Sequence, residues 1–434
     1  MQRRICVIGA GPSGITALKN LLDEGLDVQC FDVNDRVGGN WLYSEEESHS
    51  SVFETTHIIS SRSLSQYADY PFDEFDPTIP DYPSHEQLAA YFQAYAKRFR
   101  LEEHIAFSTK VLYAHRESQN KWLVELEAEG ARWQEEFTDL VVCNGHHWNP
   151  RIPKYPGEFS GEFIHSHEFK KAEPFRNKRI LVIGGGNSAC DVAVETSRVS
   201  NRTAISMRRG YRIIPKFFFG KPTDVVGSGM KWLPIGLRNK LSEILLKIML
   251  GSNEKYGLQK PDLPFGAVHP TTNDELLYKI RHGKVHPKVD IERFEGKTIH
   301  FDDGSAEEFD VVIACTGYKI THPFLDKNLI DYSEGEVPLY LKMMHPEFSD
   351  VFFVGLFQPL GCIWPGAELQ SKIIARQLVG KWERPENIKV LVEKEVKNPH
   401  YKQVKTPRHT ITVDYHLFRR ALLKQLPKKW VRKG

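Results

Sequence analysis

Short apolar runs, tight turns and amphipathic stretches alternate along the chain. Residues 5–8 are apolar, and a glycine-rich turn at 9–14, an amphipathic stretch and a second apolar run follow them before Asp32. This order predicts a strand, a turn, a helix and a strand. Residues 179–206 repeat the same order. The pattern therefore predicts two strand–turn–helix–strand units in an α/β protein.

The first turn fits the G-x-G-x-x-G spacing of dinucleotide-binding folds. The first glycine permits the sharp turn, the second lets the backbone approach a pyrophosphate, and the third lets the helix pack closely on the strand. The helix N-terminus then presents free N–H groups to the phosphates. At the end of the second strand, a carboxylate accepts a hydrogen bond from a ribose hydroxyl. The predicted contacts of this unit are Gly9, Ala10, Gly11, Pro12, Ser13, Gly14 and Asp32.

The second unit carries basic residues at the end of its second strand. Arg208 and Arg209 stand where the first unit has Asp32, and guanidinium groups there suit a ribose 2′-phosphate. NADPH is therefore favoured over NADH, although two solvated arginines at a strand end would give the same pattern. The predicted contacts of this unit are Gly184, Gly186, Asn187, Ser188, Ala189, Asp191, Arg208 and Arg209.

Two such units in one chain imply two dinucleotides that exchange a hydride. The acid after the first turn favours FAD, whose ribose is unphosphorylated, and the arginines favour NADPH. Residues 36–43 follow the acid, and their glycines allow close approach to the flavin while Asn40 and Trp41 cover it. A glycine turn beside a buried tryptophan is the alternative interpretation. The further predicted FAD contacts are Arg36, Gly39, Asn40, Trp41, Val111 and Gln358.

Two similar segments, 139–150 and 309–319, each consist of an apolar run followed by small residues. They flank the second glycine turn, so we interpret them as the points where the chain passes between domains. The predicted fold is α/β with two Rossmann-like dinucleotide-binding domains, the NADPH domain inserted into a discontinuous FAD domain. The predicted ranges are 1–165 and 316–434 for the FAD-binding domain, 166–315 for the NADPH-binding domain, and a helical insert near 217–270.

Apolar residues inside this insert recur at helical spacing between 231 and 251. They are Leu237, Leu241, Ile244, Leu245 and Ile248, with basic residues interspersed. The pattern predicts a helix that is buried over the active-site cleft, and a membrane-surface or substrate-entry helix is the alternative. The substrate pocket is expected from 213–226 and 265–277, where aromatic side chains suit an apolar molecule.

The composition is that of an ordinary globular protein. Hydrophobic residues make up 41% and charged residues 26% of the 434 residues, and the net charge is +2. This charge gives no indication of nucleic acid binding, and no apolar run reaches the roughly 18 residues of a membrane span. The six cysteines form no Cys-x-x-Cys pair. We therefore expect reduced cysteines, a cytoplasmic location and no metal site.

The connector at 159–170 carries a family signature. Phe159, Gly161, His165, Phe169 and Lys170 match F-x-G-x-x-x-H-x-x-x-[YF]-[KR], and the chain thereby resembles the class B flavin-dependent monooxygenases. The Phe-Lys ending resembles the flavin-containing monooxygenase branch, whereas Baeyer–Villiger monooxygenases typically end it with Trp-Pro. Further motifs in the family's order are GGNW at 38–41, CNGHHWNP at 143–150, GGGNSACD at 184–191, NDELL at 273–277, CTGY at 315–318, QPLG at 358–361 and AELQ at 367–370.

The resemblance implies an NADPH- and O2-dependent monooxygenase. NADPH would reduce FAD, and the reduced flavin would take up O2 as a C4a-hydroperoxide until a soft nitrogen or sulfur nucleophile of a small molecule removes the distal oxygen. The protein would contribute positioning and exclusion of water rather than a nucleophile. A homodimer is one candidate assembly.

One position departs from the family pattern. A gap-free match places Ile59 where the flavin-containing branch has an asparagine near the flavin, followed by Ser60. The predicted catalytic residues are Ser60, which would take over the hydrogen bond of that asparagine, and His165, which would set the geometry of a hinge. Ile59 also favours the alternative of a FAD/NADPH electron-transfer or NADPH oxidase-like flavoprotein without oxygenation. Baeyer–Villiger oxygenation of ketones is a further alternative.

Overall fold

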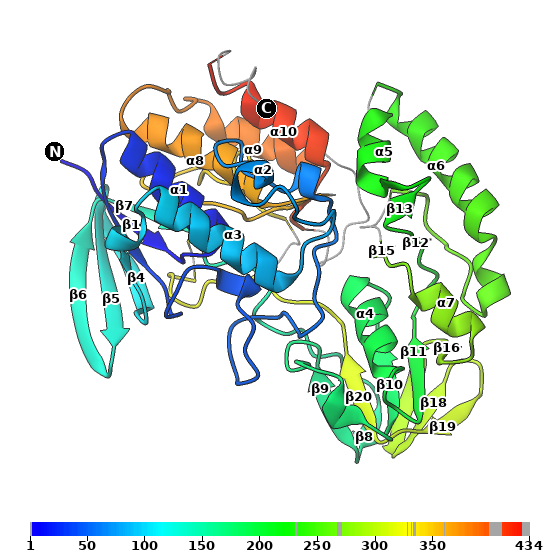
Figure 1. The fold of residues 1–434 in the computed structure, drawn as a ribbon. Helices are drawn as coiled ribbons and strands as arrows, with labels where there is room; N and C mark the ends of the chain where they lie inside the picture. Colours follow the sequence, from blue (N-terminus) through cyan, green and yellow to red (C-terminus); the bar gives the residue numbers. More distant parts are fainter. Residues whose placement is uncertain are drawn as a thin grey trace. The chain divides into compact units, whose positions relative to one another are not determined.

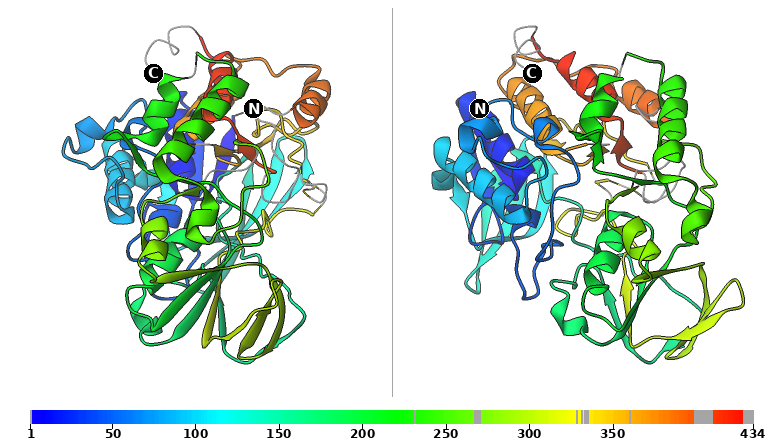
Figure 2. Two further views of the ribbon diagram at one scale, coloured as in Figure 1. Left: turned by 90° about the vertical axis from the view of Figure 1, so that its right-hand side faces the viewer. Right: turned by 45° about the vertical axis from the view of Figure 1, so that its right-hand side comes forward.

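A computed structural model gives the fold of the chain (Figure 1, with two further views in Figure 2). It describes residues 2–230, 232–266, 271–327, 329–330, 332, 336–359, 361–398 and 410–427. The chain divides into two compact units: unit 1 consists of Met1–Leu42, Ser60–His146 and Ile320–Gly434, and unit 2 consists of Tyr43–Ile59 and His147–Lys319.

Unit 1 is built on a five-stranded parallel sheet in the order β21-β7-β1-β2-β3. The strands are β1 (Arg4–Ile8), β2 (Asp27–Phe31), β3 (Ile105–Ala106), β7 (Asp139–Val142) and β21 (Val351–Phe353). The central strands are buried almost throughout because both faces of the sheet are covered, which explains their continuous apolar sequence.

Helices and a second sheet cover this parallel sheet. Helix α1 (Pro12–Asp23) packs against α8 (Trp364–Leu378) and against β1 and β2. Alternate strand residues, such as Cys6 and Ile8, share a core with the antiparallel sheet β4-β5-β6. The strands of that sheet are β4 (Lys110–Ser118), β5 (Lys121–Ala128) and β6 (Ala131–Phe137). The other elements of unit 1 are α2 (Phe72–Phe75), α3 (His85–Arg98), α9 (Ile388–Lys397), α10 (Tyr415–Leu423), β22 (Gln358–Pro359), β23 (Thr412–Val413), and the 3-10 helices η1 (Gly39–Trp41), η2 (Arg62–Leu64) and η3 (Glu102–His104).

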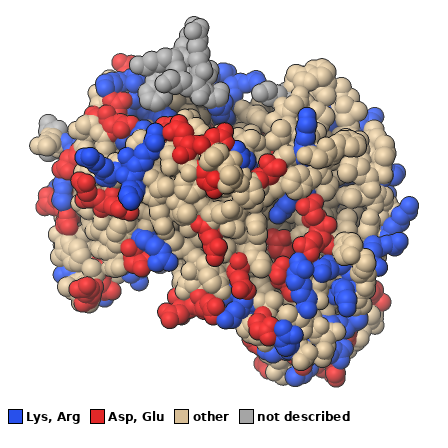
Figure 3. Space-filling view, in the orientation of Figure 1, with Lys and Arg blue, Asp and Glu red and all other residues tan. Residues whose placement is uncertain are grey.

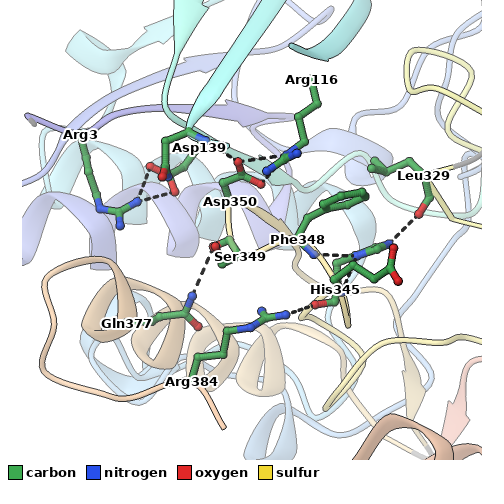
Figure 4. A network of polar contacts seen from close by, with 12 residues as sticks. Arg3, Arg116, Asp139, Leu329, His345, Phe348, Ser349, Asp350, Gln377 and Arg384 are labelled. Carbon is green, nitrogen blue, oxygen red and sulfur yellow. Dashed lines mark hydrogen bonds and ion pairs between the residues drawn. The ribbon is translucent and has the colours of Figure 1, made fainter. Parts of the chain in front are cut away.

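Buried ion pairs close the amino-terminal end of this sheet (Figure 4). Asp139 begins β7 and Asp350 precedes β21, and both are fully buried. Arg3 donates to the two Asp139 oxygens at 2.7 and 2.9 Å, and Arg116 Nε donates to those of Asp350 at 2.9 and 3.1 Å. Buried carboxylates need such partners. This end of the sheet is therefore structural, and the first glycine turn lies at the opposite, carboxyl end of β1.

Unit 2 repeats the β–α–β arrangement with its own parallel sheet in the order β16-β11-β10-β20-β9. Alternation along β10 separates two cores: Ile180 and Val182 face one that includes residues of α4, while Leu181 and Ile183 face one shared with the sheet β19-β18-β17-β8. The strands of the two sheets are β9 (Glu162–His165), β10 (Arg179–Ile183), β11 (Arg202–Ser206), β16 (Val285–Lys288), β20 (Val311–Ala314), β8 (Gly157–Phe159), β17 (Ile291–Gly296), β18 (Thr298–Phe301) and β19 (Ala306–Glu308). The other elements are α4 (Asn187–Thr196), α5 (Thr223–Gly229), α6 (Ile235–Leu250), α7 (Leu276–Arg281), β12 (Ile213–Ile214), β13 (Phe217–Phe218), β14 (Lys221–Pro222), β15 (Thr271–Thr272), η4 (Glu173–Phe175) and η5 (Asn253–Tyr256).

The repeated β–α–β arrangement confirms the predicted α/β fold with two Rossmann-like domains. The chain passes between the units at 146/147 and 319/320, within or at the end of the segments 139–150 and 309–319, and also at 42/43 and 59/60, which the sequence did not predict. Residues 43–59, 147–165 and 316–319, which the predicted ranges assign to the first domain, lie in unit 2. The reasons are long-range contacts within unit 2: β8 pairs with β17, β9 pairs with β20, and Phe53 packs on Phe169.

The helix predicted in the insert forms as α6, but its predicted burial is wrong. None of its residues is buried, and the exposed fractions of Ile244 and Ile248 are 48% and 75%. Figure 3 shows the surface over α5 and α6 as mostly uncharged, with a few Lys and Arg side chains. Helical spacing identifies an apolar face, but it does not say what covers that face.

Among the described residues, no helix combines the length and the apolar character needed to cross a membrane. The six cysteines, all of them in the described part of the chain, are free thiols; Cys315 is half-buried and the other five are buried.

Candidate functional site

The first predicted nucleotide turn joins β1 to α1 in unit 1. Gly9 has a φ of +100°, and a Cβ there would lie 2.8 Å from the carbonyl oxygen of Cys143. A Cβ on Gly14 would lie 1.7 Å from the Gly9 oxygen, so only glycine lets the helix come this close to the strand. Gly39 faces Gly11, and a Cβ on Gly39 would lie 2.8 Å from the Gly11 Cα. Helix α1 begins with no side-chain cap, so its first N–H groups suit a pyrophosphate.

Asp32 braces this turn from the end of β2. One carboxylate oxygen accepts a 2.5 Å hydrogen bond from the N–H of Ala10, and the other accepts one of 2.8 Å from the N–H of Asn34. The side chain is buried. The oxygen that binds the Asn34 N–H also accepts a hydrogen bond of 2.9 Å from the Asn34 side-chain amide. The carboxylate is therefore held in a fixed position at the end of β2, where the prediction places the ribose.

Trp41 belongs to a chain of contacts that reaches Ser60. The rings of Trp41 and Trp364 meet edge to face with centroids 5.9 Å apart. The Trp364 indole N–H donates to the carbonyl oxygen of Ser65 at 2.7 Å, and the hydroxyls of Ser65 and Ser60 are 2.8 Å apart in a hydrogen bond. The structure therefore brings two predicted site residues, Trp41 and Ser60, into one cluster of unit 1.

Other predicted FAD contacts are more scattered within unit 1. The Gln358 side-chain oxygen accepts from His146 Nε2 at 3.2 Å, and burial lowers the pKa of this histidine. Arg36 is exposed and pairs with Asp35 at 3.2 Å. The side chain of Val111 is buried in the core beneath the sheet, so a cofactor contact there would use its backbone.

The second turn joins β10 to α4 in unit 2 and is equally tight. Gly184 has a φ of +137°, and a Cβ there would lie 2.6 Å from the carbonyl oxygen of Cys315. The ring of Tyr211 lies so close over Gly185 that a Cβ would approach it to 2.2 Å. Ala189 stands in place of the third glycine and is fully buried. Helix α4, like α1, begins without a side-chain cap.

Residues 271–273 support the second turn, a role that the sequence analysis missed. The Thr271 hydroxyl donates to the Gly185 carbonyl at 2.8 Å. The backbone N–H of Thr272 donates to the side-chain oxygen of Asn187 at 2.7 Å. Asn273 donates to Asp191 at 2.7 Å, and burial raises the pKa of Asp191 to about 6. The polar run before the NDELL motif was a visible signal, but only folding places it beside a turn so distant in sequence.

Arg208 and Arg209 follow directly after β11. Arg208 is exposed, and Arg209 is half-buried with its guanidinium 5.4 Å from the centroid of the Tyr211 ring. Neither arginine forms an ion pair with another residue that the structure describes, unlike the nearby Arg202 and Arg212. Their charges are therefore open to an anion such as a 2′-phosphate.

His165 lies at the end of β9 and is fully buried. Its Nδ1 accepts the N–H of His167 at 3.1 Å, and its ring meets that of Tyr318 edge to face at 5.3 Å. The rings of His147 and His167 also contact Tyr318, at 5.5 and 5.9 Å. Burial lowers the pKa of His165 to about 4, so its imidazole is neutral at pH 7 and does not act as an acid there.

The end of the 159–170 signature holds residues 43–59 in place within unit 2. Phe169 is fully buried and packs edge to face on Phe53, with centroids 5.4 Å apart. Lys170 Nζ donates to the Ser50 carbonyl at 2.7 Å, and its own carbonyl accepts the N–H of Glu54 at 2.8 Å. The signature therefore anchors the segment that directly follows Trp41 and Leu42.

Three predicted features extend outside the described residues. They concern residues 267–270 of the predicted pocket stretch, Leu360 of the QPLG motif and Lys231 at the start of the predicted helix.

Comparison with known proteins places these features in a wider group. A family model described as flavin-binding monooxygenase-like, or FMO-like, matches residues 2–429. The chain is 34% identical over 436 residues to flavin-containing monooxygenase 5 of Rattus norvegicus, covering 95% of this chain and 81% of the relative. It is 33% identical over 407 residues to dimethylaniline monooxygenase (N-oxide-forming) 2 of Macaca mulatta, covering 89% and 75%. Its fold is similar to that of S-allyl-L-cysteine S-oxygenase from Allium sativum, with a TM-score of 0.74 at 22% identity over 98% of this chain and 88% of that chain.

Proposed function

Because the chain belongs to the FMO-like family and is an NADPH-dependent flavin monooxygenase that uses FAD, we propose that it oxygenates a soft nitrogen or sulfur atom of a small molecule. The observation that carries the proposal is the similarity over 89% of the chain to an N-oxide-forming monooxygenase. The Phe169-Lys170 ending of the signature supports the same branch.

The residues of unit 1 fit FAD. The cradle between Gly11 and Gly39 would bring the backbone against the pyrophosphate, and the uncapped start of α1 would donate N–H groups to it. Asp32 would accept the ribose hydroxyl, and Trp41 would cover the flavin. Bound FAD supplies the redox chemistry with NADPH and O2, and the chain binds it, orients it and excludes water.

The residues of unit 2 fit NADPH. The turn at 184–189 would hold the pyrophosphate, while Arg208 and Arg209 would bind the 2′-phosphate. His165 would act as a positioning residue, because its neutral, buried ring holds the backbone of His167 and packs on Tyr318. Ser60 would orient a hydrogen-bonding group near the flavin. Homodimerisation and a cytoplasmic location stay predictions from the sequence.

Measuring the oxygenated product and H2O2 formed per NADPH consumed tests the proposal. Purified protein, with its flavin, is supplied with NADPH, O2 and in turn a tertiary amine, a thioether and a cyclic ketone, while product oxide, lactone and H2O2 are counted separately. We expect amine or thioether oxide in proportion to NADPH consumed. Lactone as the main product would instead identify Baeyer–Villiger chemistry.

A second candidate function rests on Ile59. This half-buried, apolar residue offers no hydrogen bond where the family branch has an asparagine, which favours a flavoprotein that oxidises NADPH without oxygenating a substrate. Release of one H2O2 per NADPH with every substrate would establish that function and contradict the first. Ile59→Asn is then the informative variant, since restored amide hydrogen bonding should lower the H2O2 fraction.

A further inference from the structure

The loop between β11 and β12 is fastened at both ends by side chains of the insert. The Asn253 side-chain amide donates to the carbonyl oxygen of Tyr211 at 2.9 Å and to that of Gln259 at 3.0 Å. The Gln259 amide in turn donates to the carbonyl oxygen of Met207 at 3.1 Å. These amides therefore tie together the start and the end of the stretch 207–211, which carries Arg208 and Arg209.

Backbone packing fixes the middle of the same loop. A Cβ on Gly210 would lie 2.3 Å from the carbonyl carbon of Lys260 and 2.4 Å from the Gln259 oxygen, so the two backbones are in direct contact. Leu258 and Met207 are buried in the same core. The segment 253–260 therefore supports the loop through backbone contact and a shared core as well as through hydrogen bonds.

The fastened loop also meets the second glycine turn. Tyr211, whose carbonyl Asn253 holds, covers Gly185 and lies beneath the Arg209 guanidinium. The two arginine side chains thus extend from a loop whose ends are fixed, while their own charges make no ion pair with residues that the structure describes. A charged group on a pre-organised backbone binds an anion with less loss of conformational entropy than one on a mobile loop.

We propose that Asn253 and Gln259 are positioning residues for recognition of the NADPH 2′-phosphate. The proposal rests on the proposed function of Arg208 and Arg209. The segment 253–260 of the insert would then set how strongly the enzyme prefers NADPH to NADH. This role would be additional to the substrate pocket that the sequence predicts in the insert. The contribution of the two amides should act through the arginines and disappear when the arginines are absent.

A double-mutant cycle tests this dependence. NADP+ affinity is measured by calorimetry on the full-length, FAD-loaded protein, for Asn253→Ala and Gln259→Ala in the native background and in an Arg208→Ala, Arg209→Ala background. We expect each amide variant to weaken NADP+ roughly tenfold in the native background and less than twofold in the second. Asn239→Ala is the matched control, because this amide of α6 donates to the Phe265 carbonyl at 3.0 Å and holds no part of the loop.

The outcomes separate the two levels of the proposal. Unchanged NADP+ affinity in the arginine variant would overturn the assignment of the 2′-phosphate site. A weaker arginine variant, combined with amide variants that have no effect or an equal effect in both backgrounds, would overturn the role of Asn253 and Gln259 alone. Asn253→Leu is close to asparagine in size, removes the donor and adds no charge, so it replaces Asn253→Ala in the cycle if the alanine variant has a lowered melting temperature.

Discussion

The first nucleotide turn requires glycine at position 14, because there is no room for a Cβ there. We expect Gly14→Ala to lower the free energy of unfolding by about 2–3 kcal/mol and to lose FAD, because the new Cβ would lie 1.7 Å from the Gly9 oxygen. Urea unfolding and flavin absorbance of the purified protein measure both effects.

Gly236 provides the matched control for this substitution. It also lies in a helix, but apart from its chain neighbours and the backbone of its own helix no atom that the structure describes lies within 4 Å of the position of its Cβ. Gly236→Ala should leave FAD unchanged and raise the free energy of unfolding by up to about 1 kcal/mol, since alanine is the better helix former. Equal losses in the two variants would contradict the close approach seen at Gly14.

Asp191 makes stability depend on pH in an unusual direction. Burial raises its pKa from 3.8 to about 6, so between these values the folded state holds the proton more tightly than the unfolded state. The free energy of unfolding therefore falls as pH rises through this window. Asp191→Asn cannot lose a proton, and we expect it to be more stable than the native protein by about 1–3 kcal/mol at pH 7, with the difference vanishing below pH 4. Chemical unfolding across pH 3–8 measures this.

Asp310 gives the opposite sign under the same measurement. Hydrogen bonds from the Arg179 N–H and from Lys297 hold the pKa of its carboxyl below its ordinary value. Its contribution to stability is present above that ordinary value and is lost as pH falls through the lowered pKa. Asp310→Asn should therefore be the less stable protein at pH 7. The same sign for both variants would contradict these assignments.

At the scale of elements, α6 and β11 both contain apolar residues, but these residues differ in how deeply they are buried. Ile205 of β11 is fully buried, whereas Ile248 of α6 is 75% exposed. We expect Ile205→Ala to lower the free energy of unfolding by about 2–5 kcal/mol and Ile248→Ala to change it by less than about 0.5 kcal/mol. Urea unfolding measures both, and a large loss at Ile248 would show that another surface covers α6 in solution.

The insert also has a role that depends on its packing against a neighbouring loop and that its own sequence does not indicate. Its helical spacing predicted α6 correctly, and the aromatic residues of 213–226 were visible, yet nothing local indicated that 253–260 supports the loop after β11. The contact between Gly210 and Lys260 joins residues that are distant in sequence. Local patterns report periodicity within an element, while such a contact depends on how the elements pack.

For the whole molecule, we expect the two nucleotides to bind independently at the two glycine turns. Gly14→Ala should lose FAD but keep binding of 2′,5′-ADP, a fragment of NADP. Gly184→Ala should do the reverse, because its φ of +137° and a Cβ 2.6 Å from the Cys315 oxygen affect only the turn of unit 2. Flavin absorbance and calorimetry measure the two ligands. Loss of both ligands in one variant would contradict a division of the cofactors between the units.

The sequence by itself determined the two nucleotide turns, the acid after the first, the arginines after the second and the class of fold. These features follow from short-range spacing, because a strand, a tight turn and a helix are built from consecutive residues. The signature at 159–170 could likewise be read from letters alone.

Only the tertiary structure decided how distant segments complete these units. The pairing of β9 with β20 joins the end of the segment 147–165 to the sheet of unit 2. Phe169 and Lys170 contact residues 43–59 and hold them in the same unit. Thr271 and Asn273 form hydrogen bonds with residues of the second turn and its helix. Each of these contacts joins residues far apart in the chain. Their formation depends on which buried surfaces and hydrogen-bonding groups match once the sheets have formed, and no local spacing encodes that match.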